Sequence, residues 1–195
     1  MWEQNVGVGD LECRMIRGKG SGIPVVLLHG YMFTSEVWKE IGLLSSLEEQ
    51  KVLFFALDMP YGAKSKCSSR RRDPELSVRI VEEAVGEEPL IVGASLGGYM
   101  ALKYSVKNPV KGLVLIAPTG GLEEDLVKNY HKIEGQKTII YGEKDEIVSL
   151  EEMKKLSEAL GAELKIYENA RHPAYLDYPQ KFVQDVLNFY ESCFK

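Results

Sequence analysis

One short stretch, residues 90–100, constrains the fold more than any other part of the chain. Leu90-Ile91-Val92 is an unbroken apolar run, which is typical of a short buried strand. Gly93-Ala94-Ser95-Leu96-Gly97 follows at once, and the residues after it have the spacing of a helix that ends near Pro109. Strand, sharp turn and helix is the context in which Gly-x-Ser-x-Gly presents a nucleophilic serine. The alternative is a glycine-rich turn with an incidental serine, and the rest of the chain decides between them.

The glycines on either side of Ser95 have a steric reason. A serine hydroxyl that stands clear of a sheet needs a tight, strained turn, and Gly93 and Gly97 let strand and helix backbones pass close to each other. The N–H of Leu96 would then lie at a helix N-terminus, where a developing oxyanion is stabilised. Leu96 is therefore a predicted oxyanion-hole residue.

Apolar runs alternate with helical patterns along the chain. Two extended pieces within residues 3–17 form a predicted hairpin, and the later predicted strands are Val25–Leu28, Val52–Leu57, Leu90–Val92, Gly112–Ala117, Lys137–Tyr141 and Glu163–Tyr167. The predicted helices cover about 35–49, 74–85, 99–108, 122–131, 150–160 and 179–193. This alternation requires crossover connections. We predict a single α/β domain, residues 1–195, with a mostly parallel sheet of about seven or eight strands and helices on both faces.

The composition excludes several classes of protein. A net charge of −5 argues against a nucleic-acid binder that relies on phosphate contacts. No secretory signal and no run near the roughly 20 apolar residues of a membrane span are evident, so no membrane partner is predicted. Cys13, Cys67 and Cys193 are odd in number and scattered, which favours free thiols and a cytoplasmic location over a disulfide framework. The spacing of histidines and cysteines predicts no metal site, and no cofactor is expected.

Polar residues at the ends of the predicted strands are the candidate site. In parallel sheets of this kind ligands bind beyond the carboxyl ends of the strands. A serine needs a base to become a good nucleophile, and that base needs an orienting acid. His172 lies just past the last strand and is held in a loop by Pro173, which makes it the predicted base. His131 falls on a polar helix and is predicted to be a surface residue.

The acid is predicted in the loop that follows Tyr141. Asp145 is favoured, but Glu143 and Glu146 lie in the same loop and remain alternatives. The order Ser95, Asp145, His172 is the serine–acid–histidine order of α/β-hydrolases.

The chain resembles an α/β-hydrolase over nearly its whole length. Five segments in the right order carry the resemblance: His29-Gly30-Tyr31 with Trp38, Asp58–Ser65, the Ser95 turn, Gly142–Val148 and His172–Pro179. Tyr61 departs from the pattern, because it stands where the Asp-x-Pro-Gly-x-Gly-x-Ser loop has its first glycine. Residues 28–38 and 172–177 are also similar to the small lidless hydrolases of the α/β-hydrolase domain-containing protein 14 group. The serine turn of that group can diverge from a strict Gly-x-Ser-x-Gly.

The resemblance implies a role for each site residue. Ser95 would attack a carbonyl, His172 would move the proton, and Asp145 would fix the tautomer of His172. The N–H groups of Tyr31 and Leu96 would hold the oxyanion. The same resemblance implies structural roles, without catalysis, for His29 and Asp58.

The length of the chain adds an expectation about the substrate. Only 19 residues separate Ala117 from Lys137, where larger members insert a lid, so we expect little or no lid. An open site suits small esters or an acyl group on a larger carrier. The predicted function is a serine hydrolase that cleaves small carboxylic esters or thioesters through an acyl-enzyme. The alternatives are an acyltransferase with the same triad and a non-catalytic binding protein on the same fold.

A strongly basic loop follows the strand that ends at Leu57. Five cations lie within nine residues: Lys64, Lys66, Arg70, Arg71 and Arg72. The loop is either a solvated mobile segment or a docking site for an anionic group, such as a phosphate-bearing carrier or an acidic partner. Cys67 lies inside it without an acid or base of its own and is interpreted as incidental.

Overall fold

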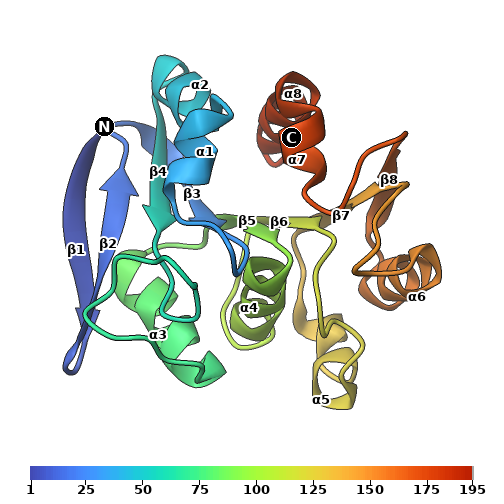
Figure 1. Ribbon diagram of the computed structural model, residues 1–195, viewed down its shortest axis with the longest axis horizontal. Coiled ribbons are helices and arrows are strands. Elements are labelled where there is room, and N and C mark those ends of the chain that lie inside the picture. The colour runs from blue at the N-terminus through green and yellow to red at the C-terminus, as the bar shows by residue number, and fades with distance from the viewer. Residues whose placement is uncertain (195) are drawn as a thin grey trace.

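The computed structural model describes residues 1–194 and is built on an eight-stranded sheet (Figure 1). The strands are β1 (Trp2–Val8), β2 (Leu11–Arg17), β3 (Ser21–Leu28), β4 (Val52–Leu57), β5 (Leu90–Ala94), β6 (Gly112–Ile116), β7 (Gln136–Gly142) and β8 (Glu163–Tyr167). Their order is β1-β2-β4-β3-β5-β6-β7-β8. β1 and β2 form an antiparallel hairpin and β2 pairs antiparallel with β4, whereas all pairs from β4 to β8 are parallel. The predicted mostly parallel sheet is confirmed.

Helices cover both faces of the sheet. They are α1 (Glu36–Glu40), α2 (Leu43–Glu49), α3 (Pro74–Ala84), α4 (Leu96–Ser105), α5 (Glu124–Val127), the 3₁₀ helix η1 (Tyr130–Lys132), α6 (Leu150–Leu160), α7 (Ala174–Asp177) and α8 (Pro179–Ser192). In Figure 1, α1, α2, α7 and α8 lie above the sheet, and α3 to α6 lie below it. Between β6 and β7 the described chain forms only α5 and η1, so residues 1–194 contain no large lid.

The central strands are apolar without alternation because both faces of the sheet are covered. Leu27 and Leu28 point to opposite faces and both are fully buried, one in each of the two cores. Burial of a leucine side chain contributes about 1.5–3 kcal/mol. The uninterrupted apolar runs are therefore what holds the two helical layers on the sheet.

Two of the predicted helices are interrupted. The helix expected over residues 35–49 is split into α1 and α2 by Gly42, whose φ of 84° lies in the left-handed region that glycine tolerates. The helix expected over residues 122–131 is reduced to α5 and η1. Apolar spacing alone predicted the extent of these segments, but it did not reveal the breaks.

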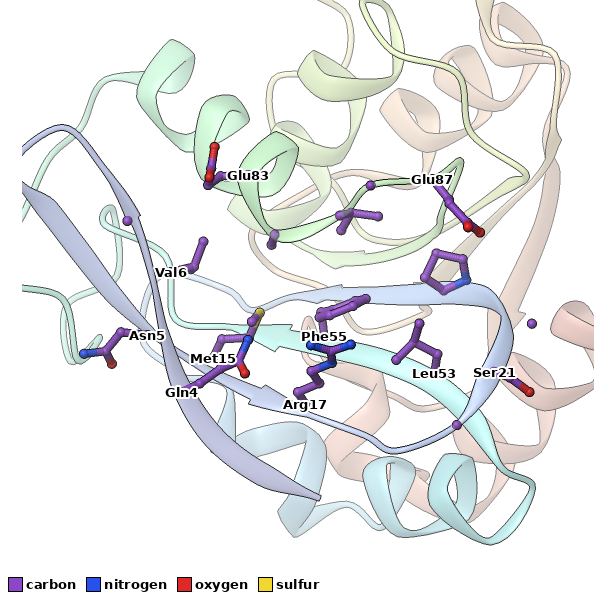
Figure 2. A pocket seen from close by; sticks show the side chains of 17 residues that line it. Gln4, Asn5, Val6, Met15, Arg17, Ser21, Leu53, Phe55, Glu83 and Glu87 are labelled. Atoms are coloured by element: carbon purple, nitrogen blue, oxygen red, sulfur yellow. The ribbon is translucent and has the colours of Figure 1, made fainter.

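One large cavity of the protein includes none of the residues Ser95, Asp145 and His172. A cavity of about 730 Å³ opens between the first four strands and the C-terminal end of α3, as Figure 2 shows. Arg17 lies on its floor, with the guanidinium carbon 5.3 Å from the centre of the Phe55 ring. No serine–histidine pair lines this cavity in the described residues.

Among residues 1–194, no helix combines the length and apolarity needed to cross a lipid bilayer.

The prediction that all three cysteines are free is wrong. Cys13 of β2 and Cys67 of the basic loop form a disulfide, and Cys193 is free. The loop runs antiparallel to β2 at this position and brings the two Cα atoms to 4.0 Å. The residues are 54 positions apart, so this contact depends on the fold and not on a spacing visible in the sequence. The cysteines therefore no longer favour a cytoplasmic location.

Candidate active site

Ser95 occupies the tight turn between β5 and α4. Its backbone angles, φ 52° and ψ −112°, are strained for a residue with a side chain. A Cβ atom on Gly97 would lie 2.2 Å from the carbonyl oxygen of Leu28, and one on Gly93 would lie 2.6 Å from the carbonyl oxygen of Gly97. Both positions exclude any larger residue. The turn thus has the close backbone approaches that the sequence predicted.

Three loops bring Ser95, His172 and Asp145 together. His172 Nε2 lies 2.9 Å from Ser95 Oγ, and His172 Nδ1 lies 2.6 Å from Asp145 Oδ2. Asp145 follows β7 and His172 follows β8, so the carboxyl ends of β5, β7 and β8 supply the three side chains. The side chain of Asp145 is fully buried and that of His172 is 19% exposed. The arrangement is a hydrogen-bonded chain from a buried carboxylate to an accessible hydroxyl.

The loop geometry selects among the three carboxylates that the sequence left open. Oδ1 of Asp145 accepts the N–H groups of Ile147 at 2.7 Å and Val148 at 2.8 Å, which leaves Oδ2 for His172. Glu143 instead accepts the N–H of Asn169, and the exposed Glu146 makes no contact with His172 among the described residues. Asp145 is therefore the carboxylate that meets the histidine.

Asp145 is held in its charged form. Burial disfavours the charge and would raise the pKa of this carboxyl. The hydrogen bonds from His172, Val148 and Ile147 outweigh burial, so the pKa of Asp145 lies below its ordinary value. A charged carboxylate at this position accepts the Nδ1–H of His172 and leaves Nε2 free to accept a proton from Ser95.

A small apolar pocket opens at Ser95. Its volume is about 280 Å³, and its polar side chains near the serine are those of Ser95 itself, His172 and two tyrosines. The inner wall is formed by Phe33, Ala94, Ile116, Pro173 and Tyr175. The outer wall is formed by Tyr31, Met32 and Ile147, which are 40%, 55% and 70% exposed. The pocket is therefore open to solvent on one side and apolar inside.

The two predicted oxyanion donors belong to two segments that adjoin the serine. Leu96 is the first residue of α4, and Tyr31 lies in the loop that leads from β3 to α1. This loop passes close to the nucleophile, because a Cβ on Gly30 would lie 3.7 Å from Cβ of Ser95. Within residues 1–194, neither N–H donates a hydrogen bond to another backbone group outside regular elements. That Tyr31 and Leu96 form an oxyanion hole stays a prediction.

His29 is enclosed beneath the same loop. The N–H of Met59 donates to His29 Nε2 at 2.9 Å, so Nε2 carries no proton and Nδ1 donates to the carbonyl of Gly30 at 2.7 Å. Burial lowers the pKa of His29 and keeps it neutral. Tyr61, the residue that departs from the family pattern, donates its hydroxyl to the carbonyl of His29 at 2.6 Å. These contacts fix the start of the loop that carries Tyr31.

The basic loop reaches the pocket through one contact that the sequence did not reveal. Arg70 donates to the hydroxyl of Tyr31 at 2.7 Å, and its guanidinium carbon lies 5.3 Å from the centre of that ring. Arg71 pairs with Asp10 at 3.5 Å. In the part of the chain that the structure describes, no carboxylate lies within ion-pair distance of the four other cations of this loop. They are here termed the loop cations: Lys64, Lys66, Arg70 and Arg72.

Within residues 1–194, no cluster of three or more His, Cys, Asp or Glu side chains could hold a metal ion.

Comparison with known proteins places this chain in a family. The family described as "Alpha/beta hydrolase family" matches residues 25–134, which is more than half of the chain. The chain therefore belongs to the alpha/beta hydrolase family, and its curated relatives make it ABHD14-like, as predicted.

Curated relatives support this assignment, and a solved structure shares the fold. Protein ABHD14A of Danio rerio is 33% identical over 175 residues, which cover 86% of this chain and 64% of that protein. The putative protein-lysine deacylase ABHD14B of Rattus norvegicus is 28% identical over 93% of this chain and 89% of its own length. The chain thus spans less than two thirds of the ABHD14A protein. The crystal structure of a predicted CIB-like hydrolase from Thermoplasma acidophilum shares the fold, with a TM-score of 0.86, 23% identity and 98% coverage of both chains.

Proposed function

We propose that the protein is a serine hydrolase that cleaves small carboxylic esters or thioesters through an acyl-enzyme at Ser95. One observation carries the proposal: the hydrogen-bonded chain from Asp145 through His172 to Ser95 Oγ, with distances of 2.6 and 2.9 Å. It ends at an open apolar pocket. A buried acid, an oriented imidazole and an accessible hydroxyl are the parts that acyl transfer to serine requires.

The first half of the reaction forms the acyl-enzyme. Ser95 Oγ attacks the carbonyl carbon of the substrate while His172 Nε2 takes the hydroxyl proton. Asp145 stabilises the imidazolium that forms. The carbonyl oxygen becomes negatively charged and is bound by the N–H groups of Leu96 and Tyr31. His172 then gives its proton to the leaving oxygen or sulfur as the bond from that atom to the carbonyl carbon breaks.

The second half returns the free enzyme. A water molecule enters on the open side of the pocket and loses a proton to His172 as its oxygen attacks the acyl carbon. The same two N–H groups hold the second oxyanion. His172 protonates Ser95 Oγ, the ester bond to the enzyme breaks, and the carboxylic acid leaves.

The size and lining of the pocket favour a substrate with a small acyl group. A volume of about 280 Å³ lies just below the usual range of small-molecule sites, about 300–1,000 Å³. Its inner wall suits an apolar acyl group, and the leaving group would extend outward past Met32 and Ile147. We further propose that the loop cations receive an anionic group on the substrate or its carrier, because Arg70 lies against Tyr31 of the outer wall.

A second candidate is acyl transfer, or removal of an acyl group from a protein lysine. The same residues would act, with another acceptor in place of water or with an amide in place of an ester. The relatives named putative protein-lysine deacylase favour it, and so does the absence of a large lid, since an acylated lysine on a protein needs an exposed site. A binding protein without catalysis is the remaining alternative.

Labelling with a fluorophosphonate probe tests the proposal. The wild-type protein is expected to be labelled, and the variants Ser95→Ala and His172→Ala are expected to lose labelling. Ser45→Ala and His131→Ala are the matched controls, because Ser45 and His131 are exposed residues remote from the pocket. Short-chain aryl esters, acyl thioesters and an acetylated lysine peptide then identify the substrate class. No labelling of folded wild-type protein would favour the binding protein.

A further inference from the structure

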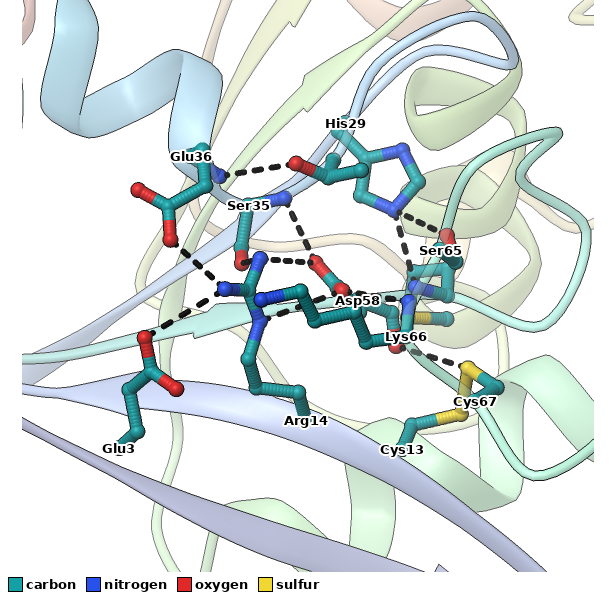
Figure 3. Close-up of polar contacts among 12 residues, drawn as sticks. Glu3, Cys13, Arg14, His29, Ser35, Glu36, Asp58, Ser65, Lys66 and Cys67 are labelled. Carbon is teal, nitrogen blue, oxygen red and sulfur yellow. Dashed lines mark hydrogen bonds and ion pairs between the residues drawn. A yellow bond between two sulfur atoms is a disulfide. The ribbon is translucent and has the colours of Figure 1, made fainter.

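A buried arginine lies behind the loop that carries Tyr31 and takes no part in the reaction described above. Arg14 belongs to β2 and is 4% exposed. Figure 3 shows its guanidinium beneath the segment from His29 to Glu36. Burial of a charge is costly unless several polar partners surround it. The position of this arginine therefore requires an explanation from its contacts.

The guanidinium joins three elements. Nη2 donates to Ser35 Oγ at 3.1 Å and to Asp58 Oδ1 at 3.4 Å, and Nε lies 3.3 Å from Asp58 Oδ2. Nη1 donates to Glu36 at 2.7 Å and to Glu3 at 3.4 Å. The planar fork of arginine can reach this many acceptors in fixed directions, whereas a lysine ammonium is a single point of charge.

Among the partners of Arg14, Asp58 accepts hydrogen bonds from both loops that hold Tyr31. Its Oδ1 accepts the N–H of Ser35 at 2.7 Å, at the end of the loop that contains Tyr31. Its Oδ2 accepts the N–H of Lys66 at 2.7 Å. The segment between Asp58 and Lys66 includes Ala63, whose N–H donates to the carbonyl of Tyr31 at 2.8 Å. One carboxylate thus fixes the end of one loop and the curvature of the other.

The backbone around Arg14 is fixed independently of its side chain. Its N–H donates to the carbonyl of Lys66, and its carbonyl accepts the N–H of Asp58, both at 2.9 Å. The neighbouring Cys13–Cys67 disulfide joins the same two segments. A substitution at Arg14 therefore removes the guanidinium while these connections remain.

We propose that Arg14 is a positioning residue for the oxyanion hole, which holds Asp58 and Ser35 so that the N–H of Tyr31 points at the reacting carbonyl oxygen. The inference rests on the proposed function. Stability alone does not require a buried arginine with this many directed contacts, because apolar residues of similar volume often stabilise a fold as well as a buried ion pair does. A misplacement of about 1 Å at a reacting centre can reduce the rate by about 100-fold.

The test compares Arg14→Met and Arg14→Lys with two controls. Glu3→Gln removes the negative charge of a peripheral partner of Arg14 whose side chain is 58% exposed. Val186→Ala removes a buried side chain of α8, which belongs to neither loop and does not line the pocket, and supplies a destabilised protein in which every contact of Arg14 remains. For each variant we would measure the thermal midpoint, the rate of fluorophosphonate labelling, and kcat and KM on a short-chain aryl ester.

The expected pattern separates positioning from stability. Arg14→Met should lower kcat and the labelling rate by about 10- to 100-fold with KM within about twofold, and Arg14→Lys should recover part of the loss. Val186→Ala should keep kcat despite a lower midpoint, and Glu3→Gln should resemble wild type. If Arg14→Met does not fold, Arg14→Lys alone is compared with Val186→Ala. A kcat near wild type in the folded Arg14 variants, or an equal loss in Val186→Ala, would overturn the inference, whereas inactive wild type would overturn the proposed function.

Discussion

Replacement of Asp145 by asparagine should abolish the function of His172 as a base while leaving the fold intact. An amide has one oxygen and one NH₂ group, and the loop dictates which goes where. The N–H groups of Ile147 and Val148 both point at Oδ1, so the amide oxygen must take that place. The NH₂ group then occupies the Oδ2 position, 2.6 Å from His172 Nδ1.

The magnitude of the effect follows from the tautomer. Because NH₂ donates, His172 Nδ1 must become an acceptor and its proton moves to Nε2, which faces Ser95. This tautomer cannot take the serine proton. Loss of the correct tautomer costs about 10⁴-fold in kcat in a serine protease, which corresponds to about 5.4 kcal/mol in the activation free energy. KM should change little, since Asp145 does not line the pocket.

The assay is the steady-state hydrolysis of a short-chain aryl ester, with kcat calculated per mole of folded protein. Glu143→Gln and Glu146→Gln are the matched controls, because they change the two other carboxylates of the same loop. Both should retain kcat within about twofold of wild type. A loss of less than tenfold in Asp145→Asn, or a similar loss in either control, would refute the assignment of Asp145 as the orienting acid.

Three further predictions concern stability and substrate charge. Burial opposes the charge of Asp58, but hydrogen bonds from Ser35 and Lys66 lower the pKa of this carboxyl below its ordinary value. The charged form of Asp58 therefore stabilises the folded protein above about pH 4, and this contribution is lost as the pH falls through the lower pKa of the folded state. Urea unfolding should show that Asp58→Asn is less destabilising at pH 3 than at pH 7, and an equal effect at both would contradict this. The Cys13→Ser/Cys67→Ser variant, with a separation of 54 residues, should lose about 4 kcal/mol in the free energy of unfolding; an unchanged urea midpoint would count against the disulfide. Alanine at all four loop cations should raise KM for an ester with an anionic leaving group and spare a neutral ester of equal size, whereas equal effects on both would argue for a merely solvated loop.

The sequence by itself determined the parts of the protein that depend on local pattern. The unbroken apolar runs predicted buried parallel strands, because a strand covered on both faces has no polar side to show. Gly93 and Gly97 around Ser95 predicted the tight turn, because only a residue without Cβ fits the backbone contacts found there. The positions of His172 and Asp145 after their strands followed from the same strand order.

Only the tertiary structure decided the contacts between distant segments. It selected Asp145 over Glu143 and Glu146, because the direction of the N–H groups in that loop is not written in its composition. It joined Cys13 to Cys67, against the prediction of free thiols. The burial of Arg14 behind the loop of Tyr31 likewise has no local signature, since an arginine in an edge hairpin ordinarily faces solvent. Short-range periodicity fixes which elements form, whereas the partners of a charged side chain depend on how loops far apart in the chain meet after those elements have packed.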